Sequence, residues 1–251
     1  MRKRIVAGNW KMNTTLQEGK MLLSRLLDAS LPNDVNRKII IIPPFTHLSE
    51  FGNLLKDSPI LLGAQNISYE VSGAFTGEVS ASMVKACGSD YVIIGHSERR
   101  QYFNENNDLL ALKIDLALDH ELTPIYCCGE REEDRDKGTY FSIIGQQIKE
   151  GLFHLDNKHI TKLMIAYEPV WAIGTGKNAT PSQAQEVQAF IRKMLSEKYG
   201  TNISSEITIL YGGSIKGTNA CELFTQPDID GGLVGGASLN IPEFLQIIEA
   251  L

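Results

Sequence analysis

Leu163-Met164-Ile165-Ala166-Tyr167 is the stretch that decides the fold, because this apolar run is followed at once by Glu168-Pro169. A short apolar run of this kind indicates a buried strand. Glu168 then stands where the strand leaves the core, and Pro169 favours an extended backbone at Glu168. A carboxylate held partly out of water at such a point can act as a base.

Similar short apolar runs recur about every thirty residues on both sides of this strand, with longer amphipathic stretches between them. That period is typical of a repeated unit of one strand and one helix. We predict eight strands, at Ile5–Asn9, Ile39–Ile42, Ile60–Gln65, Tyr91–Gly95, Thr123–Cys127, Leu163–Tyr167, Ile207–Tyr211 and Gly231–Val234.

The amphipathic stretches predict eight helices, the clearest of them at residues 16–28, 106–120, 182–199 and 241–250. Eight parallel units in a chain of 251 residues favour an α/β fold of the closed (β/α)8 barrel type. An open doubly wound sheet would usually have fewer strands. Because no linker or change in composition interrupts the chain, we expect a single domain over residues 1–251.

Composition excludes several kinds of partner. The formal net charge is −6, so no overall positive field would attract nucleic acid or an anionic membrane. The basic residues Arg2-Lys3-Arg4 precede an apolar stretch too short for a secretory signal, and no run is long enough for a membrane span. We expect a cytoplasmic protein that binds neither nucleic acid nor membrane.

The cysteines and histidines do not form a recognisable metal site. Four cysteines and five histidines are scattered, without a Cys-x-x-Cys pair or histidines at helical spacing. We expect reduced thiols and no structural metal.

Polar residues collect where the predicted strands end, which is where a barrel of this type carries its active site. Asn9 and Lys11 follow the first strand, and on an extended backbone their side chains would point to the same side. His96 follows the fourth strand, where it can donate a hydrogen bond to a carbonyl. Taken alone, each of these residues is more simply explained as surface or as structure.

Paired glycines follow the last two predicted strands, in Tyr211-Gly212-Gly213-Ser214 and Val234-Gly235-Gly236-Ala237-Ser238. Glycines before a helix expose backbone N–H groups that can bind phosphate. Tight turns would explain either pair alone. Both pairs together stand where this architecture commonly binds phosphate, so we favour anion binding.

These segments, together with Gly73-Ala74-Phe75-Thr76-Gly77-Glu78, resemble the triosephosphate isomerase family over essentially the whole chain. The motifs occur in the family's order and spacing: Gly-Asn-Trp-Lys from Gly8, Gly-His-Ser-Glu-Arg-Arg from Gly95, Ala-Tyr-Glu-Pro-Val-Trp-Ala-Ile-Gly-Thr-Gly from Ala166, Tyr-Gly-Gly-Ser from Tyr211 and Val-Gly-Gly-Ala-Ser-Leu from Val234.

The resemblance implies a cofactor-free isomerase that interconverts D-glyceraldehyde 3-phosphate and dihydroxyacetone phosphate through an enediolate, in glycolysis and gluconeogenesis. It makes Glu168 the base and His96 a neutral electrophile, with Asn9 and Lys11 binding substrate and the enediolate. The phosphate would be bound by Gly174, Ser214, Gly235 and Gly236.

The resemblance also implies that residues 169–179 form a lid and that the loop around Thr76 reaches into a second subunit beside Asn9 and Lys11. A homodimer follows from that loop. Glu98 and Cys127 match family positions near the site and are given supporting roles. Two positions depart from the family. Cys128 stands where the family more often has an aliphatic residue, and Asn178 stands at the far end of the lid, where the family varies.

Two alternatives from other functional classes are considered. One is a phosphosugar aldolase that forms a Schiff base through Lys11, although the segment from Glu168 to Gly176 would then have no purpose. The other is a non-catalytic phosphate-binding or surface-interaction protein that retains the fold, which the presence of Asn9, Lys11, His96 and Glu168 argues against.

Overall fold

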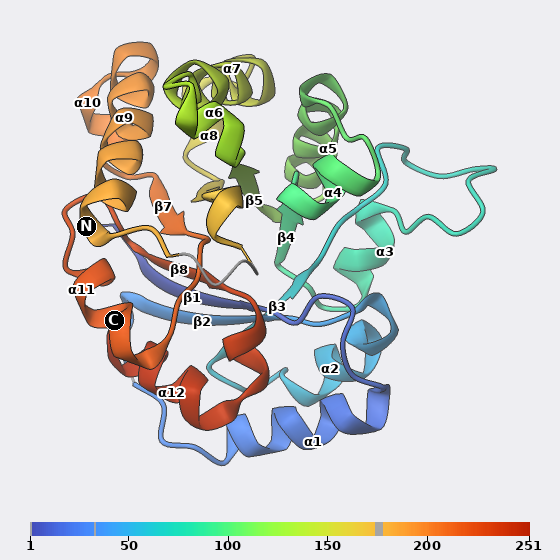
Figure 1. Cartoon of the computed structure of the whole chain (residues 1–251). Helices are drawn as coiled ribbons and strands as arrows, with labels where there is room; N and C mark the ends of the chain where they lie inside the picture. The colour runs from blue at the N-terminus through green and yellow to red at the C-terminus, as the bar shows by residue number, and fades with distance from the viewer. Residues whose placement is uncertain (1, 33, 174–177) are drawn as a thin grey trace.

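Eight parallel strands close into a barrel in the computed structural model, which describes residues 2–32, 34–173 and 178–251. Each strand pairs with the next along the chain, and the last pairs with the first (Figure 1). This confirms the predicted closed (β/α)8 barrel. The strands are β1 (Arg4–Asn9), β2 (Arg37–Ile42), β3 (Ile60–Ala64), β4 (Tyr91–Ile94), β5 (Thr123–Cys128), β6 (Met164–Tyr167), β7 (Thr208–Tyr211) and β8 (Gly231–Val234).

All eight predicted strands are present, and their ends differ from the prediction by no more than two residues. The largest difference is at β2, which begins at Arg37 because Arg37 and Lys38 pair with Arg4 and Ile5 of β1. The apolar pattern could not show this extension, since the two added residues are charged.

Helices surround the barrel (Figure 1). The four clearest predicted helices are confirmed to within one residue at each end, and the described residues contain further short helices in the loops. None of the helices that the structure describes is long and apolar enough to cross a membrane. The helices are α1 (Leu16–Leu27), α2 (Leu48–Leu54), α3 (Ala81–Ala86), α4 (Ser97–Tyr102), α5 (Asn107–Asp119), α6 (Glu132–Asp136), α7 (Tyr140–Leu152), α8 (Asn157–Ile160), α9 (Pro181–Tyr199), α10 (Thr201–Ser204), α11 (Gly217–Phe224) and α12 (Ile241–Glu249), with 3-10 turns η1 (Phe45–His47), η2 (Val170–Ala172) and η3 (Gly236–Leu239).

The buried side chains form two clusters, one inside the barrel and one between the barrel and its helices. Alternate residues of each strand point to opposite faces of the sheet, so neighbours in the sequence enter different clusters. Ala166 and Cys127 belong to the smaller, inner cluster, whereas Tyr167 and Cys128 belong to the larger, outer one. Both faces of every strand are therefore covered, which explains why the strands are continuous apolar runs.

The buried face of α5 carries one charge that the predicted apolar face did not anticipate. Lys113 lies on this face beside Leu110 and Ile114. Its Nζ is 2.6 Å from Glu105 Oε1 and 2.8 Å from Asn66 Oδ1. Burial lowers the pKa of Lys113, while Glu105 opposes that effect. A buried lysine is tolerated here because both of its partners are also buried.

Candidate active site

One cavity of about 400 Å³ at the carboxyl ends of the strands brings the predicted site residues together. We call it the front cavity. Segments far apart in the sequence meet there because the carboxyl ends of parallel strands all lie at one end of the barrel. Its lining consists of Asn9, Lys11, His96, Glu98, Glu168, Ile173, residues 212–216, Leu233 and residues 235–237.

Asn9 and Lys11 both reach the front cavity, but the predicted reason was wrong. The strand ends at Asn9, and Lys11 has a φ of 54°, so the extended backbone does not continue. Two hydrogen bonds hold this left-handed turn: Lys11 N–H donates to Asn9 Oδ1 at 3.0 Å, and Gln65 Nε2 donates to the Lys11 carbonyl at 2.7 Å. A non-glycine residue with this φ is uncommon and often marks a functional site.

The Lys11 ammonium group is held across the cavity. Its Nζ lies 2.6 Å from Glu98 Oε1, which follows β4, and its side chain passes close to the Cα of Gly235. This contact with Glu98 fixes the direction of the Lys11 side chain.

His96 joins the end of β4 to the first turn of α4, where it is the N-cap residue. Its Nδ1 accepts a hydrogen bond from the Glu98 N–H at 3.2 Å, which assigns the ring proton to Nε2. Burial lowers the pKa of His96, but the nearby Glu168 carboxylate raises it, and the result lies above the ordinary value of 6.5.

Glu168 is buried at the end of β6, with 1% of its surface exposed. Oε1 lies 3.0 Å from His96 Nε2, and Oε2 accepts a hydrogen bond from the Ser97 N–H at 2.8 Å. Burial raises the pKa of Glu168, but His96, the Ser97 N–H and Lys11 together bring it below the ordinary value of 4.5. The carboxyl group is therefore ionised at neutral pH and able to accept a proton.

Two glycines that directly follow the neighbouring strands β5 and β7 leave space for Glu168. This packing role was not predicted from the sequence. A Cβ on Gly129 would lie 1.7 Å from the Glu168 carbonyl oxygen, and one on Gly212 would lie 2.9 Å from Glu168 Cγ. The positions of Gly129 after β5 and Gly212 after β7 were the available signal, because these strands flank β6.

The two paired-glycine segments form one wall of the front cavity, and Ser214, Gly235 and Gly236 all line it. A Cβ added to Gly236 would have no atom within 4 Å, so packing does not require glycine there. Glycine at such a place suits close approach of the backbone to a ligand. Gly174, the fourth predicted phosphate residue, lies outside the described residues.

The first part of the predicted lid is anchored by a residue that the sequence analysis missed. Glu130 is buried, and its Oε1 accepts hydrogen bonds from Trp171 Nε1 at 2.8 Å and Tyr167 OH at 3.1 Å. Ile173 lines the front cavity. Residues 174–177 of the lid lie outside the described part, and the chain resumes before α9, which Thr180 caps.

No group of three or more histidine, cysteine or acidic residues within residues 2–32, 34–173 and 178–251 is arranged to hold a metal ion. All four cysteines are free. Cys127 is buried beside Glu168, and burial and that carboxylate raise its pKa. A thiol in this state is neutral at pH 7 beside the Glu168 carboxylate.

Comparisons with known proteins agree over the whole chain. A model of the triosephosphate isomerase family matches residues 4–251. The triosephosphate isomerase of Porphyromonas gingivalis is 53% identical over 251 residues, which cover 100% of both chains. That of Bacteroides fragilis is 50% identical over 250 residues, covering 100% of this chain and 99% of the relative. That of Flavobacterium johnsoniae is 47% identical over 251 residues, again with full coverage of both chains.

Proposed function

This chain belongs to the triosephosphate isomerase family, and from that premise we propose a role for each residue of the front cavity. The protein interconverts D-glyceraldehyde 3-phosphate and dihydroxyacetone phosphate, a step of glycolysis. Because the reaction is reversible, we assign it to gluconeogenesis as well. Membership of this family also argues against the aldolase and the binding-protein alternatives.

The contact between Glu168 and His96 is the observation that carries the assignment of the chemistry. A carboxylate and a ring N–H lie 3.0 Å apart in a cavity that also contains an ammonium group. A substrate placed between them would have its α-hydrogen at the base and its carbonyl oxygen at the donors. This is the geometry required for abstraction of a proton beside a carbonyl group.

In the forward step, Glu168 releases the Ser97 N–H, turns toward the substrate and takes the proton from C2 of glyceraldehyde 3-phosphate. The electron pair of the C–H bond forms the enediolate double bond, and negative charge develops on the former carbonyl oxygen. The proton of the C2 hydroxyl passes to the C1 oxygen, and return of the abstracted proton from Glu168 to C1 then gives dihydroxyacetone phosphate with its carbonyl at C2. A buried base suits this task because little water then lies between the carboxylate and the substrate in the front cavity.

His96 and Lys11 stabilise the charge that develops on oxygen. When Glu168 turns to the substrate, the carboxylate that raises the pKa of His96 most moves away, while burial, which lowers that pKa and is the largest effect, remains against the smaller opposing effect of Glu98. The imidazole is then neutral and donates from Nε2, as in the mechanism known for this family. Lys11 supplies a positive charge, and Asn9, whose Oδ1 accepts from Lys11 N–H, donates through its amide group.

The phosphate group would bind against Ser214, Gly235 and Gly236, and Gly174 is the fourth residue proposed. Backbone N–H groups of the paired glycines, at the start of the 3-10 turn η3, are suitable anion donors. Residues 169–179 would then cover the bound substrate. Exclusion of water there protects the enediolate phosphate from losing its phosphate group.

Replacing Lys11 with methionine tests this site without touching the base. We expect kcat/KM for glyceraldehyde 3-phosphate to fall by about 10²- to 10³-fold, because one preorganised charge is lost from the enediolate. The measurement is a coupled assay with no metal or nucleotide cofactor added to the isomerase. Lys20→Met is the control, since Lys20 is partly exposed and pairs with Glu50 on the surface. A Lys11→Met enzyme with wild-type kcat/KM would contradict the assignment.

We also propose a homodimer formed through the loop around Thr76. The segment between β3 and α3 extends away from the barrel (Figure 1). It is closed at its base by a backbone hydrogen bond from Ser68 to Val79 and braced by the edge-on contact of Tyr69 and Phe75. Tyr69 and Phe75 are 41% and 38% exposed. A braced loop with exposed aromatic side chains suits insertion into a second copy of the chain.

Thr76→Glu is expected to shift the protein from dimer to monomer, because a carboxylate at the loop tip would have to be buried in the partner. Sedimentation velocity at micromolar concentration measures the change. Val35→Glu serves as the control, since Val35 is 89% exposed and lies outside this loop. A monomeric wild type would contradict the proposal, as would a Thr76→Glu variant that remains a dimer.

Two further proposals concern the domain organisation and the location of the protein. We propose that residues 1–251 form one domain, since the barrel uses strands from Arg4 to Val234. A cytoplasmic location remains our proposal on the grounds of composition and of the glycolytic reaction.

A further inference from the structure

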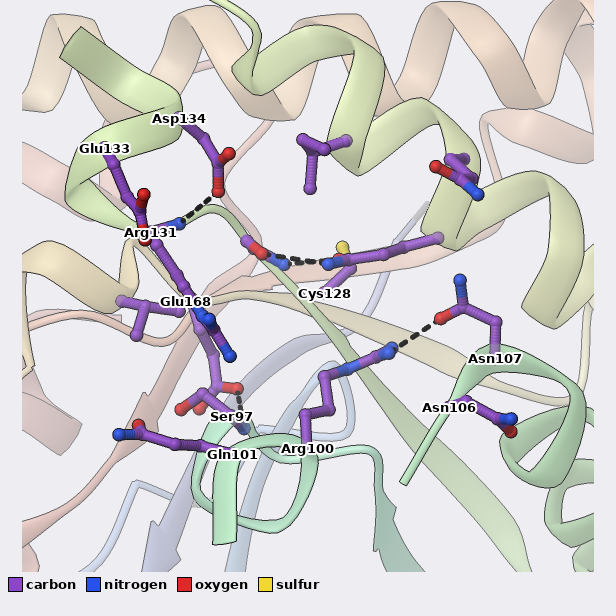
Figure 2. A pocket seen from close by; sticks show the side chains of 15 residues that line it. Ser97, Arg100, Gln101, Asn106, Asn107, Cys128, Arg131, Glu133, Asp134 and Glu168 are labelled. Carbon is purple, nitrogen blue, oxygen red and sulfur yellow. Dashed lines mark hydrogen bonds between the residues drawn. The ribbon is translucent and has the colours of Figure 1, made fainter. Parts of the chain in front are cut away.

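A second cavity, of about 410 Å³, lies behind the catalytic base (Figure 2). We call it the rear cavity, and its lining includes Ser97, Gln101, Cys128, Arg131, Gln146 and Glu168. Among the residues that the structure describes, Glu168 is the one that lines both the front and the rear cavity. The base therefore forms part of the partition between two separate spaces.

The rear cavity runs from the surface to Glu168. Its inner end is buried, with exposures of 1% for Glu168, 1% for Cys128 and 8% for Ser97. Its outer end is formed by exposed residues such as Gln101 and Gln146. Solvent can thus approach the base from this side.

The two oxygens of Glu168 have partners that belong to different cavities. Oε1 is next to His96, which lines the front cavity, and Oε2 is bonded to the N–H of Ser97, which lines the rear cavity. Figure 2 shows the bond to Ser97 at the inner end of the rear cavity. In this position the carboxylate already has one oxygen on the rear side.

The walls of the rear cavity are polar and fixed, which favours ordered water. Arg100 donates to Gly95 O, Asn107 Oδ1, Tyr126 OH and Cys127 O, and Gln147 both donates to and accepts from Gly129. These bonds prevent the walls from collapsing inward. One water takes up about 30 Å³, so the cavity has room for several molecules beside polar partners.

The other acidic group at the inner end does not compete for protons. Burial raises the pKa of the Cys128 thiol to about 12, despite the opposing effect of Arg100. A neutral thiol neither accepts a proton from Glu168 nor supplies one at neutral pH. Water is therefore the exchange partner available to the base on this side.

We propose that the rear cavity is the route by which the proton held by Glu168 exchanges with solvent during turnover. The proposal rests on the role of Glu168 as the base. After abstraction, the substrate occupies the front cavity and separates the carboxylic acid from solvent there. Rotation of the carboxyl group brings its proton to the rear side, where it passes to water while the same carboxylate takes up a solvent proton. The enediolate then receives that solvent proton, with no net change in charge.

The test is isomerisation of glyceraldehyde 3-phosphate in D₂O. Proton NMR measures two fractions of the dihydroxyacetone phosphate formed: the fraction that carries protium from the substrate and the fraction that carries deuterium from solvent. Gln146→Trp and Ile143→Phe are designed to fill the rear cavity from α7. We expect each to lower the ratio of deuterium to protium in the product by about threefold or more, since fewer waters reach the base. The value of kcat should change less than twofold.

Ser142→Trp is the matched control, because Ser142 lies on the same helix, is exposed and lines neither cavity. Its deuterium ratio should equal that of the wild type. Crystal structures of the two filled variants establish that the new side chains occupy the cavity. An unchanged ratio in variants with a filled cavity overturns the proposal. An active Glu168→Gln enzyme would instead overturn the role of the base, so the two failures are distinguishable.

Discussion

Glu168→Gln is expected to lower kcat by about 10³-fold or more while the protein keeps its fold, because an amide cannot accept the proton from the substrate. The new side chain has nearly the same shape and retains an oxygen for the Ser97 N–H, so the packing around it should be preserved. Loss of the carboxylate also removes the group that raises the pKa of His96. The effect therefore falls on the chemical step rather than on substrate binding.

The coupled assay should show a large fall in kcat with a much smaller change in KM, and far-UV circular dichroism should match the wild type. Glu168→Asp gives a graded comparison: it keeps the carboxylate but displaces it by about 1 Å, and we expect turnover to fall by well over tenfold. Glu197→Gln, on the exposed face of α9, should behave as wild type. Turnover by Glu168→Gln within tenfold of the wild type would contradict the assignment of Glu168 as the base.

Gly231→Ala is expected to destabilise the protein by about 3 kcal/mol or more, because the substitution affects the pairing that closes the barrel. Gly231 has a φ of 136°, and a Cβ there would lie 1.9 Å from the carbonyl oxygen of Ile5. Ile5 is its pairing partner across the boundary between β1 and β8. Relief of the clash requires the two strands to separate where the first and last strands meet.

Urea unfolding followed by circular dichroism measures this effect, and failure of the variant to fold at all would agree with it. Gly145→Ala is the matched control. Gly145 is also buried, but it lies in α7, and the atoms nearest to its added Cβ would be 3.6 Å away, an ordinary contact. Alanine is the better helix former, so stability should be equal or slightly higher. A Gly231→Ala protein as stable as Gly145→Ala would contradict the close approach at this boundary.

Most of the barrel could be predicted because a strand covered on both faces must be a run of apolar residues. The run at Leu163–Tyr167 and its seven counterparts carried this signal, and the order of strands followed from their regular spacing. The short helices α4, α6, α8 and α10 could not be identified in this way. They have six residues or fewer, too short to display a helical period, and capping contacts hold several of them.

The convergence of Asn9, Lys11, His96 and Glu168 could be predicted because each lies at the end of a strand or within two residues after it, and strand ends meet in a barrel. Their detailed positions could not. The turn at Lys11 depends on Gln65, which comes from the end of a different strand, and the resting position of Glu168 depends on the N–H of Ser97. Such contacts join residues distant in the sequence through backbone atoms, which leave no trace in residue type.

At Lys11 the left-handed backbone lowers the stability of the fold, while the side chain has a proposed role in the reaction. A lysine with a φ of 54° costs about 1 kcal/mol or more relative to glycine, which adopts that conformation without strain. A search for more stable variants would therefore favour glycine there and so remove the charge that we propose stabilises the enediolate. Selection for stability alone at this turn would therefore work against the proposed role of Lys11.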